Sequence, residues 1–489
     1  MAADALQPSV AARVAARWIS VDPHSLDAQR AAAKAALALH RIGDASARYR
    51  IVLTTSPAGT DAEFAKLEAE LAAADNIFGA RQVADRLASF FPASAAALRV
   101  QGFTALRADD PAAAARSFTA ALAIPGASGQ EGADAAPQGL AQTLLRARIL
   151  AGDLGPLAQA RAQVEHEETD ANRLDYALLL MAAQRDAAAT EQLEILAREP
   201  EAGPVARRLL GLIEFQEGHL DAAARRFTEL LAAGKYLDDA FYYLALIADR
   251  QGDSERALRL YAQVQTGDNV VPALLRASTI LRRHGGAAVA DELLDRLIED
   301  EPRRAPEILN ARARMYADSG DSPRAFAVLK QGITVYPDSV ELRYGLASAY
   351  DEQGQVAAAL RELTALVRAR PDDPAALNAL GYTLADHGLR LARARKLIER
   401  AHAAAPKSAA ILDSLGWVLF REGRGDEALP YLTAAYADDR GGDIAAHLGE
   451  VLWRLGKPDD AERIWSEAGA LDADNRLLKA TRQRLHAAN

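Results

Sequence analysis

Few residues of this sequence have the types and spacing that binding or catalytic chemistry requires. The acidic run EHEETD at 165–170 places several carboxylates near one another, as a cation site would need. Acidic runs between helices are usually solvated surface, and we favour that interpretation. The segment GRGDEA at 423–428 matches the glycine-rich dinucleotide-binding pattern with alanine last, but no strand precedes it. We therefore interpret it as a turn.

The histidines and the known catalytic motifs provide no stronger candidate. Nine histidines are scattered along the chain, and His387, His402 and His447 occupy different phases of the repeat described below. The sequence contains no GxSxG nucleophile elbow, no GxxxxGK phosphate-binding loop and no HExxH helix. We therefore predict no catalytic residues, no cofactor and no bound metal, and we do not expect an enzyme.

Composition indicates a globular protein that binds other proteins. The chain has 489 residues, of which 50% are hydrophobic and 25% charged, so it can bury a large core. No run reaches the roughly 18 apolar residues of a membrane helix, and MAADALQPSV has neither the basic start nor the apolar run of a signal peptide. The absence of cysteine excludes disulfides and thiolate metal sites but leaves the compartment open. A net charge of −10 disfavours nucleic acid and anionic membranes and favours a neutral or basic protein partner.

Pairs of glycines seven residues apart recur near the carboxyl terminus. The first glycine of each pair, at 381, 416 and 449, lies in an apolar helical stretch, and the second follows at 388, 423 and 456. Glycine inside a helix costs about 1 kcal/mol relative to alanine. A helix accepts that cost where another helix comes too close for any side chain, so we predict close crossings at Gly381, Gly416 and Gly449. Small residues repeat in step at Ala394, Ala428 and Ala461.

Turn and helix-end signals extend the same period upstream. Prolines at 302, 337, 371 and 406 recur at intervals of 34 or 35 residues. In the turn GDSPRA, Asp321 and Ser322 offer a helix N-cap, and Pro323 suits the first helical turn. Each unit therefore reads as helix, turn, helix.

A helical hairpin that repeats every 34 residues or so, with small residues at the crossings and proline at the end, resembles the tetratricopeptide repeat. Nine units begin near residues 170, 204, 238, 271, 306, 340, 374, 409 and 442, and weaker ones begin near 28, 61 and 95. The resemblance covers most of the chain and is strongest from residue 204 onward. It implies an all-α fold, a right-handed superhelical solenoid of helix-turn-helix repeats.

Irregular segments divide the predicted solenoid. The stretch AIPGASGQEGADAAPQG at 123–139 is too broken to be helical, and either a hinge or a solvated loop would explain it. We expect amino-terminal repeats at 1–122, starting with a half repeat, a loop or hinge at 123–139, the main solenoid at 140–471 and a capping helix at 472–489. Because PSVAARVAARWISVDP looks like a second helix without its first, we expect the full-length protein to supply more chain before residue 1.

The resemblance also implies a binding surface. In this family the first helix of each hairpin lines a concave groove, and positions two, five, nine and twelve of each unit point into it. The positions implied here are Phe215, Tyr242, Asn310, Tyr344, Asn378, Tyr382, Trp417, Phe420 and Trp453. Large amphipathic side chains there suit the anchoring of a partner's helix or extended peptide. The alternative is that they fill gaps between adjacent first helices. The lysine and asparagine clamp by which some relatives hold chaperone carboxyl termini is absent, which argues against a chaperone adaptor.

The last 110 or so residues have a closer resemblance. The segments ALNALGYTLADHG, ILDSLGWVLFREGRGDEALPYLTAA and IAAHLGEVLWRLGKPDDAERIW are similar to a group of proteobacterial repeat proteins made as outer-membrane lipoproteins. A member of that group binds and activates a periplasmic carboxyl-terminal processing protease and presents cell-wall hydrolases to it. This sequence departs from the group in lacking a signal peptide and a lipidated cysteine.

Two functions from different classes follow. The first is a noncatalytic adaptor at the periplasmic face of the outer membrane, which assembles such a protease with its substrates. The second is a general cytoplasmic scaffold for another protein complex. Repeats occupy nearly the whole of residues 1–489 and leave no room there for a catalytic domain. We expect protein partners, no nucleic acid and no direct membrane insertion by this chain.

Overall fold

The computed structural model describes residues 7–124, 139–471 and 475–487. These residues form 28 α-helices, and no strand occurs among them. The chain is 79% helical, which confirms the predicted all-α solenoid of helical hairpins. Among the described residues, every helix falls short of the length and apolar character that crossing a membrane would require.

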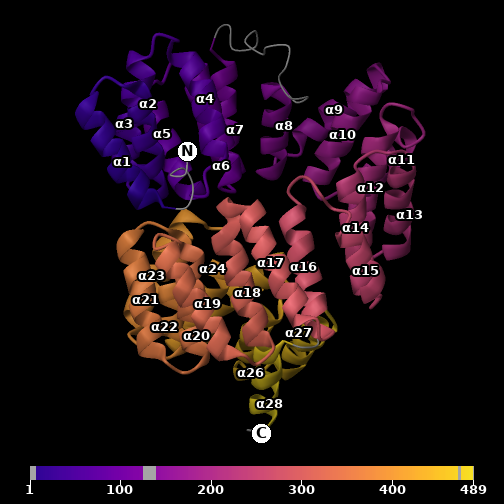
Figure 1. Cartoon of the computed structure of the whole chain (residues 1–489). Coiled ribbons are helices and arrows are strands. Elements are labelled where there is room, and N and C mark those ends of the chain that lie inside the picture. Colours follow the sequence, from indigo (N-terminus) through magenta and orange to yellow (C-terminus); the bar gives the residue numbers. More distant parts are fainter. Residues whose placement is uncertain (1–6, 125–138, 472–474, 488–489) are drawn as a thin grey trace. The chain divides into compact units, whose positions relative to one another are not determined.

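The chain forms two compact units. One takes its residues from 1–55, 73–83 and 343–489, and the other from 56–72 and 84–342. In the first unit lie α1 (Pro8–Val21), α2 (Leu26–Ala38), α3 (Ile42–Thr55), α21 (Val356–Ala369), α22 (Pro374–Asp386), α23 (Leu391–Ala404), α24 (Ala409–Arg421), α25 (Gly425–Asp438), α26 (Gly442–Arg454), α27 (Pro458–Leu471) and α28 (Arg476–Ala487) (Figure 1).

The second unit holds most of the remaining helices. They are α4 (Thr60–Ala72), α6 (Ala95–Arg107), α7 (Pro111–Leu122), α8 (Leu140–Leu150), α9 (Gly155–His166), α10 (Asp170–Ala182), α11 (Asp186–Leu196), α12 (Gly203–Gln216), α13 (Leu220–Ala232), α14 (Leu237–Arg250), α15 (Ser254–Tyr261), α16 (Val270–Arg283), α17 (Ala287–Asp300), the 3-10 helix η2 (Pro302–Arg304), α18 (Ala305–Asp318) and α19 (Ser322–Val335). The ranges of both units share α5 (Ile77–Phe90) and α20 (Val340–Glu352).

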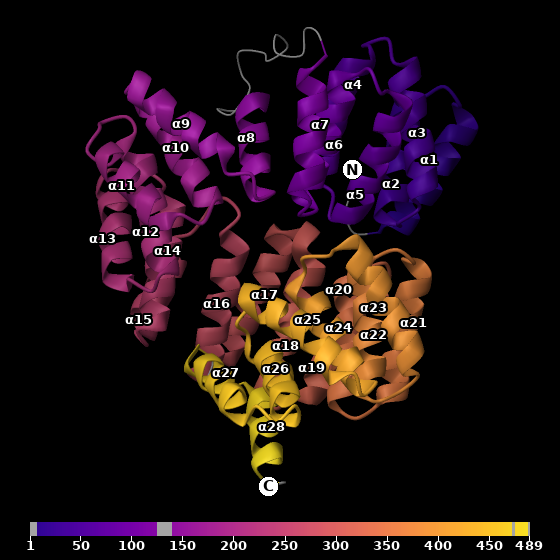
Figure 2. The same cartoon turned by 180° about the vertical axis from the view of Figure 1, so that it is seen from behind.

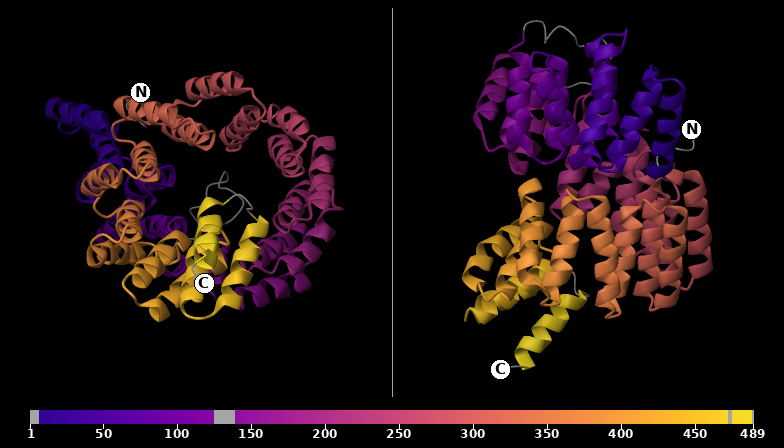
Figure 3. Two further views of the ribbon diagram at one scale, coloured as in Figure 1. Left: turned by 90° about the horizontal axis from the view of Figure 1, so that it is seen from below. Right: turned by 90° about the vertical axis from the view of Figure 1, so that its left-hand side faces the viewer.

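Consecutive helices pair as hairpins in the predicted register. The helices α10, α12, α14, α16, α18, α20, α22, α24 and α26 begin within one residue of the nine predicted unit starts. The two helices of a hairpin pack side by side, as Figure 2 shows for α22 with α23 and α24 with α25. Figure 3 gives two further views, in which the carboxy-terminal hairpins are orange to yellow. Each hairpin buries its apolar face against its neighbours in the chain, as repeat proteins do.

The helix ends follow the local signals of the sequence. The Asp321 side chain accepts a hydrogen bond from the backbone N–H of Arg324 at 3.2 Å, so it caps α19 as predicted, with Pro323 in the first turn. The four repeated prolines stand two residues beyond the ends of α17, α19, α21 and α23. Proline at such a position cannot continue the helix.

The paired glycines have two different structural roles. A Cβ atom on Gly416 would lie 2.5 Å from Cγ of Leu432 and 3.1 Å from the carbonyl oxygen of Ala428, both on the partner helix α25. Gly381 meets Ile398 in the same way, and Gly449 meets the indole of Trp465. These contacts confirm the predicted close crossings. The second glycines, at 388, 423 and 456, have φ values of +65°, +82° and +75°, a left-handed conformation that ends each first helix.

Two predicted segments lie at the edges of the described structure. Nearly all of the loop or hinge at 123–139 is outside the described residues, so its assignment stays a prediction. In the predicted capping segment, α28 packs against α26 and buries Leu478, Thr481 and Leu485.

Candidate protein-interaction surface

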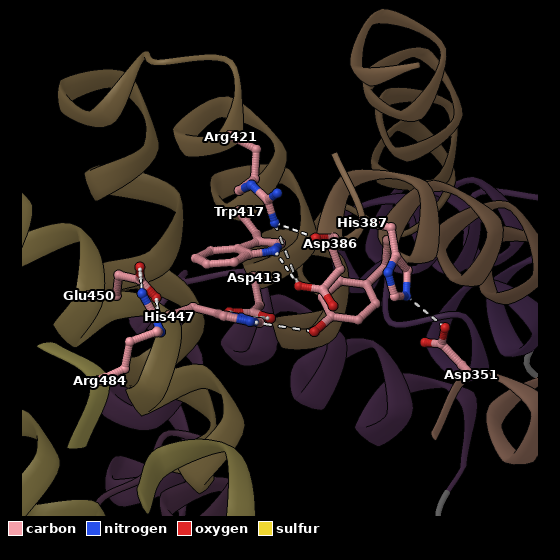
Figure 4. A network of polar contacts seen from close by, with 10 residues as sticks. Asp351, Asp386, His387, Asp413, Trp417, Arg421, His447, Glu450 and Arg484 are labelled. Carbon is pink, nitrogen blue, oxygen red and sulfur yellow. Dashed lines mark hydrogen bonds and ion pairs between the residues drawn. The ribbon is translucent and has the colours of Figure 1, made fainter. Parts of the chain in front are cut away.

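The carboxy-terminal hairpins bring three first helices together. The helix α24 packs against both α22 and α26. Each of the three also lies close to its own second helix, at the glycine crossings. Their side chains form a cluster of aromatic, acidic and histidine groups (Figure 4). We call it the carboxy-terminal cluster; its central members are Tyr382, Asp386, Asp413, Trp417 and His447.

His447 lies at the centre of this cluster. It is only 3% exposed, and its Nδ1 lies 2.9 and 3.0 Å from the two carboxylate oxygens of Asp413, which is also buried. Because the carboxylate can only accept, Nδ1 carries the proton and donates it. The Nε2 atom lies 3.4 Å from the hydroxyl of Tyr382. His447 therefore links α26 to both α24 and α22.

Electrostatics favour the charged form of this histidine. Burial by itself would lower the pKa of His447. The charge of Asp413, its hydrogen bond to the ring and the charges of Asp386 and Asp443 together outweigh burial and raise the pKa. For Tyr382, burial and the nearby carboxylates raise the pKa of the phenol, so its hydroxyl stays protonated. The cluster thus contains a buried histidine whose charged form the carboxylate of Asp413 stabilises.

Trp417 covers one side of the pair. Its ring stacks on His447 with centroids 4.2 Å apart and planes 22° apart, and its Nε1 donates to Asp386 at 3.2 Å. Arg421 lies one turn further along α24, where it donates to the backbone carbonyl of Asp386 and lies 3.8 Å from its carboxylate. The indole is therefore both packed and hydrogen-bonded.

A second pair joins the last helix to α26. The Glu450 side chain is buried, and Arg484 of α28 donates to its two oxygens at 3.0 and 2.5 Å (Figure 4). Nearby, Trp453 stacks on Trp465 at 5.6 Å and lies 5.1 Å from the ring of His486. Bidentate pairs of this kind fix orientation as well as distance.

The predicted groove residues of this region are close together but differ in exposure. Tyr382 and Trp417 belong to the carboxy-terminal cluster. The ring centroid of Phe420 lies 5.4 Å from that of Trp417. Trp417 is buried, at 6% exposure, whereas Tyr382, Phe420 and Trp453 are half-buried. Trp417 thus fills space between adjacent first helices, and the part of these residues in partner binding stays a prediction.

The other predicted residues are not members of the carboxy-terminal cluster. Phe215 is buried under the guanidinium of Arg250, at 4.1 Å, and Tyr242 is half-buried next to Tyr243. Tyr344 is 41% exposed and is the most accessible of the predicted set. In Asn310 and Asn378, at position five of their units, the side-chain oxygen is buried without a hydrogen-bond partner among the described residues.

Sequence reasoning missed Asp413, His447 and Glu450. Asp413 stands at position five of its unit, where Asn310 and Asn378 stand in theirs, so register alone would have placed it on the same face. Glu450 likewise shares position nine with Tyr382 and Trp417. His447 is 34 residues from Asp413, one repeat away. The repeat spacing was therefore a signal that could have identified these three residues, but only aromatic and asparagine side chains were considered at the groove positions.

The other sequences considered for chemistry have structural explanations. Glu165 pairs with Arg161 at 2.9 Å and Glu168 pairs with Arg173, so arginines neutralise two members of the acidic run. Within the described ranges, no group of three or more histidine and acidic side chains is arranged to hold a metal ion. In the segment GRGDEA, Gly423 is left-handed and lies with Arg424 in the turn after α24, and the remaining four residues begin α25.

Comparison with known proteins supports the repeat assignment directly. Residues 316–381 and 419–485 match one model of the tetratricopeptide repeat, and residues 208–270, 275–340 and 389–443 match a second. Together these stretches cover more than half of the chain. A TPR repeat-containing protein of Pseudomonas aeruginosa is 35% identical over 214 residues, 44% of this chain and 36% of that protein. Cellulose synthase 2 operon protein C of Komagataeibacter xylinus is 31% identical over 255 residues, 51% of this chain and 19% of that protein.

Solved structures include distant repeat proteins. A thermophilic TPR protein of Thermus thermophilus has 21% identity and a TM-score of 0.33, covering 38% of this chain and 98% of that one. Yeast Tom70 has 13% identity and a TM-score of 0.41, covering 95% of each chain. This chain matches only 36% and 19% of the length of the two sequence relatives. Tetratricopeptide repeats are protein-interaction modules, so the chain is a protein–protein interaction scaffold, and from the repeat matches it belongs to the tetratricopeptide-repeat proteins.

Proposed function

We propose that this protein is a noncatalytic adaptor at the periplasmic face of the outer membrane. It binds a carboxyl-terminal processing protease, raises the activity of that protease and presents cell-wall hydrolases to it as substrates. The hydrolysis itself belongs to the protease.

The observation that carries this proposal is the sequence of the three carboxy-terminal hairpins. The runs ALNALGYTLADHG, ILDSLGWVLFREG and IAAHLGEVLWRLG are similar to the lipoprotein group that partners such a protease. They also form α22, α24 and α26, whose packing depends on Gly381, Gly416 and Gly449. A matched relative is a TPR repeat-containing protein of a proteobacterium, Pseudomonas aeruginosa, which agrees with the proposed origin of the group.

The predicted groove positions suit an extended partner segment. Tyr344 is accessible, and Tyr382, Phe420 and Trp453 keep part of their surface exposed. Aromatic side chains provide a large contact area for little loss of side-chain entropy. Asn310 and Asn378 stand at position five of their repeats, one of the positions assigned to the groove.

Tethering is sufficient to explain activation. A scaffold that holds an enzyme and its substrate on different repeats turns their encounter into an intramolecular event, with an effective concentration of order mM. This mechanism predicts a characteristic dependence on the amount of scaffold. When scaffold exceeds both partners, enzyme and substrate occupy different scaffold molecules, and the rate falls again.

The test measures cleavage of a purified cell-wall hydrolase by a purified carboxyl-terminal processing protease while this chain is titrated in. We expect the rate to rise, to peak near equimolar scaffold and then to decline. A plateau at high scaffold would support activation of the protease without tethering. Equal cleavage with and without the chain, together with no complex by size-exclusion chromatography, would remove the proposal in favour of the cytoplasmic scaffold.

The groove assignment is tested with Tyr344→Ala. We expect weaker binding of protease or substrate without a change in thermal unfolding, because the ring is accessible. Tyr236→Ala serves as the matched control, since Tyr236 is 43% exposed but lies at the start of α14, outside the predicted positions. Equal affinities for the two variants would show that Tyr344 does not anchor a partner.

A further inference from the structure

A cavity lined by none of the named groove residues lies in the unit that holds α4 to α19, although its Leu178 and Met181 stand at positions nine and twelve of the repeat that begins at residue 170. It has a volume of about 610 Å³ and is lined by residues of α8, α9, α10 and α12. Ligand pockets usually have volumes of roughly 300–1,000 Å³. The cavity is therefore large enough for a side chain together with part of the backbone that carries it.

Gln142 and Asp175 both line the cavity and contact each other. The Gln142 side-chain N–H of α8 donates to the carboxylate of Asp175 on α10. Because a carboxylate only accepts, this bond fixes which way the amide of Gln142 points. Its oxygen, Oε1, is then left buried without a hydrogen-bond partner among the described residues. A buried acceptor without a partner is unfavourable, so a donor that reaches it on binding would stabilise the complex.

The carboxylate of Asp175 is also incompletely neutralised. Burial raises the pKa of Asp175 above its ordinary value, because water is displaced from the charged form. Within the described part of the chain, no arginine, lysine or histidine forms an ion pair with it. A cation at this point would meet both needs at once, by pairing with Asp175 and by donating to Gln142 Oε1.

The walls of the cavity suit the rest of such a group. Apolar side chains line it on α8, α10 and α12, namely Leu145, Leu178, Leu179, Met181, Ala182 and Leu209. An aliphatic stem packs well on such walls while its charged head reaches Gln142 and Asp175. Three further amides, on Gln159, Gln163 and Asn172, also line the cavity and can both donate to and accept from a peptide backbone.

We propose that this cavity binds an arginine side chain within an extended segment of a partner protein. A guanidinium group carries five N–H donors in a planar fork, which serve two carboxylate oxygens and the Gln142 amide oxygen together, whereas an ammonium group has three. Arg146 lies one helical turn beyond Gln142 on α8 and also lines the cavity. Its like charge disfavours a lone cation, so the bound segment carries an acidic residue next to its arginine. This inference does not depend on which enzyme the scaffold serves.

The test uses the full chain and short fluorescent peptides whose centre is arginine followed by aspartate. Fluorescence anisotropy compares this peptide with one in which citrulline, a neutral isostere, replaces the arginine. We expect saturable binding of the arginine peptide and at least tenfold weaker binding of the citrulline peptide, a difference of about 1.4 kcal/mol. Asp175→Asn should cause a similar loss. Glu191→Gln removes the same charge from the exposed face of the neighbouring α11 and should leave the affinity unchanged.

Circular dichroism of each variant checks that it is folded. Equal binding of the arginine and citrulline peptides, no effect of Asp175→Asn in a folded variant, or no saturable binding at millimolar peptide would each overturn the proposal. A lysine peptide that binds as tightly would overturn the assignment to a guanidinium. N-acetylargininamide that binds as tightly as the peptide would overturn the assignment to a protein segment, because the amide-lined walls would then contribute nothing.

Discussion

Single glycines determine how closely the helices of a hairpin approach. At Gly416 an added Cβ would lie 2.5 Å from Leu432 and 3.1 Å from the backbone oxygen of Ala428, which cannot move without displacing α25. We expect overpacking in Gly416→Ala to lower the free energy of unfolding by about 1 to 3 kcal/mol. The higher helix propensity of alanine offsets about 1 kcal/mol of this loss. Urea denaturation measures the difference.

Gly469 supplies a control with the same chemistry. It lies near the end of α27, and a Cβ there would meet nothing within 4 Å. Gly469→Ala should therefore be neutral or stabilising, by up to about 1 kcal/mol. If both variants shift stability in the same direction, steric contact at Gly416 is not what distinguishes it.

The buried histidine makes stability depend on pH. Its pKa is raised in the folded state, chiefly by Asp413 acting against burial, so the folded protein binds the proton more tightly than the unfolded chain does. The resulting stabilisation is complete below the unfolded value of about 6.5 and is lost as the pH rises through the raised pKa. Relative to His447→Gln, the protein should lose at most about 1.4 kcal/mol per pH unit over that interval. Asp413→Asn should reduce this slope, and an unchanged slope would contradict the role of the pair.

At the scale of elements, a buried carboxylate on α26 helps to fix the position of the last helix, α28. Arg484 of α28 donates to both oxygens of Glu450 on α26, at 3.0 and 2.5 Å. Arg484→Ala would leave Glu450 buried without its cation, at a cost of roughly 1 to 3 kcal/mol. Because the contacts of α28 are mainly with α26, we expect the loss to appear as faster amide hydrogen exchange in α28.

Arg482 provides the comparison on the same helix. It pairs with Glu462 of α27 at 2.7 Å; Arg482 is exposed and Glu462 is half-buried, whereas Glu450 is buried. Exposed pairs contribute about 0 to 1 kcal/mol, so Arg482→Ala should change exchange little. Similar exchange in the two variants would mean that apolar packing alone, through Leu478 and Leu485, holds α28.

At the scale of the whole molecule, unfolding should not be a single transition. Repeats contact mainly their neighbours, so the stability of a repeat protein is approximately a sum of local terms. Three of the four tryptophans, Trp417, Trp453 and Trp465, lie in the carboxy-terminal hairpins, whereas helical circular dichroism reports on the entire chain. We expect the urea transitions by fluorescence and by circular dichroism to have different midpoints.

The Gly416→Ala variant sharpens this comparison. Because its effect is local to α24 and α25, it should lower the fluorescence midpoint more than the circular dichroism midpoint. Coincident transitions in both proteins would show that the repeats unfold as one cooperative unit.

Much of the fold was predictable because its signals are local and repeated. The predicted starts of nine repeats agree with the structure within one residue. The signals that place them, such as the capping aspartate Asp321 and the proline after each second helix, act over a few residues and recur with a period of about 34 residues. The candidate site was predictable only in register. Position nine of the unit at 409 was assigned to the groove, yet Trp417 is buried there, because the stack on His447 and the bond to Asp386 depend on side chains of two other helices.

The sequence by itself therefore determined the hairpins, their register and the glycines at their crossings, since each depends on residues within one unit. Only the tertiary structure decided which polar groups meet. Asp413 and His447 form a buried pair across 34 residues, and Gln142 and Asp175 meet across 33. The repeat spacing indicates only that these residues lie one repeat apart; which side chains meet is decided by the packing of adjacent repeats and by the burial that this packing imposes.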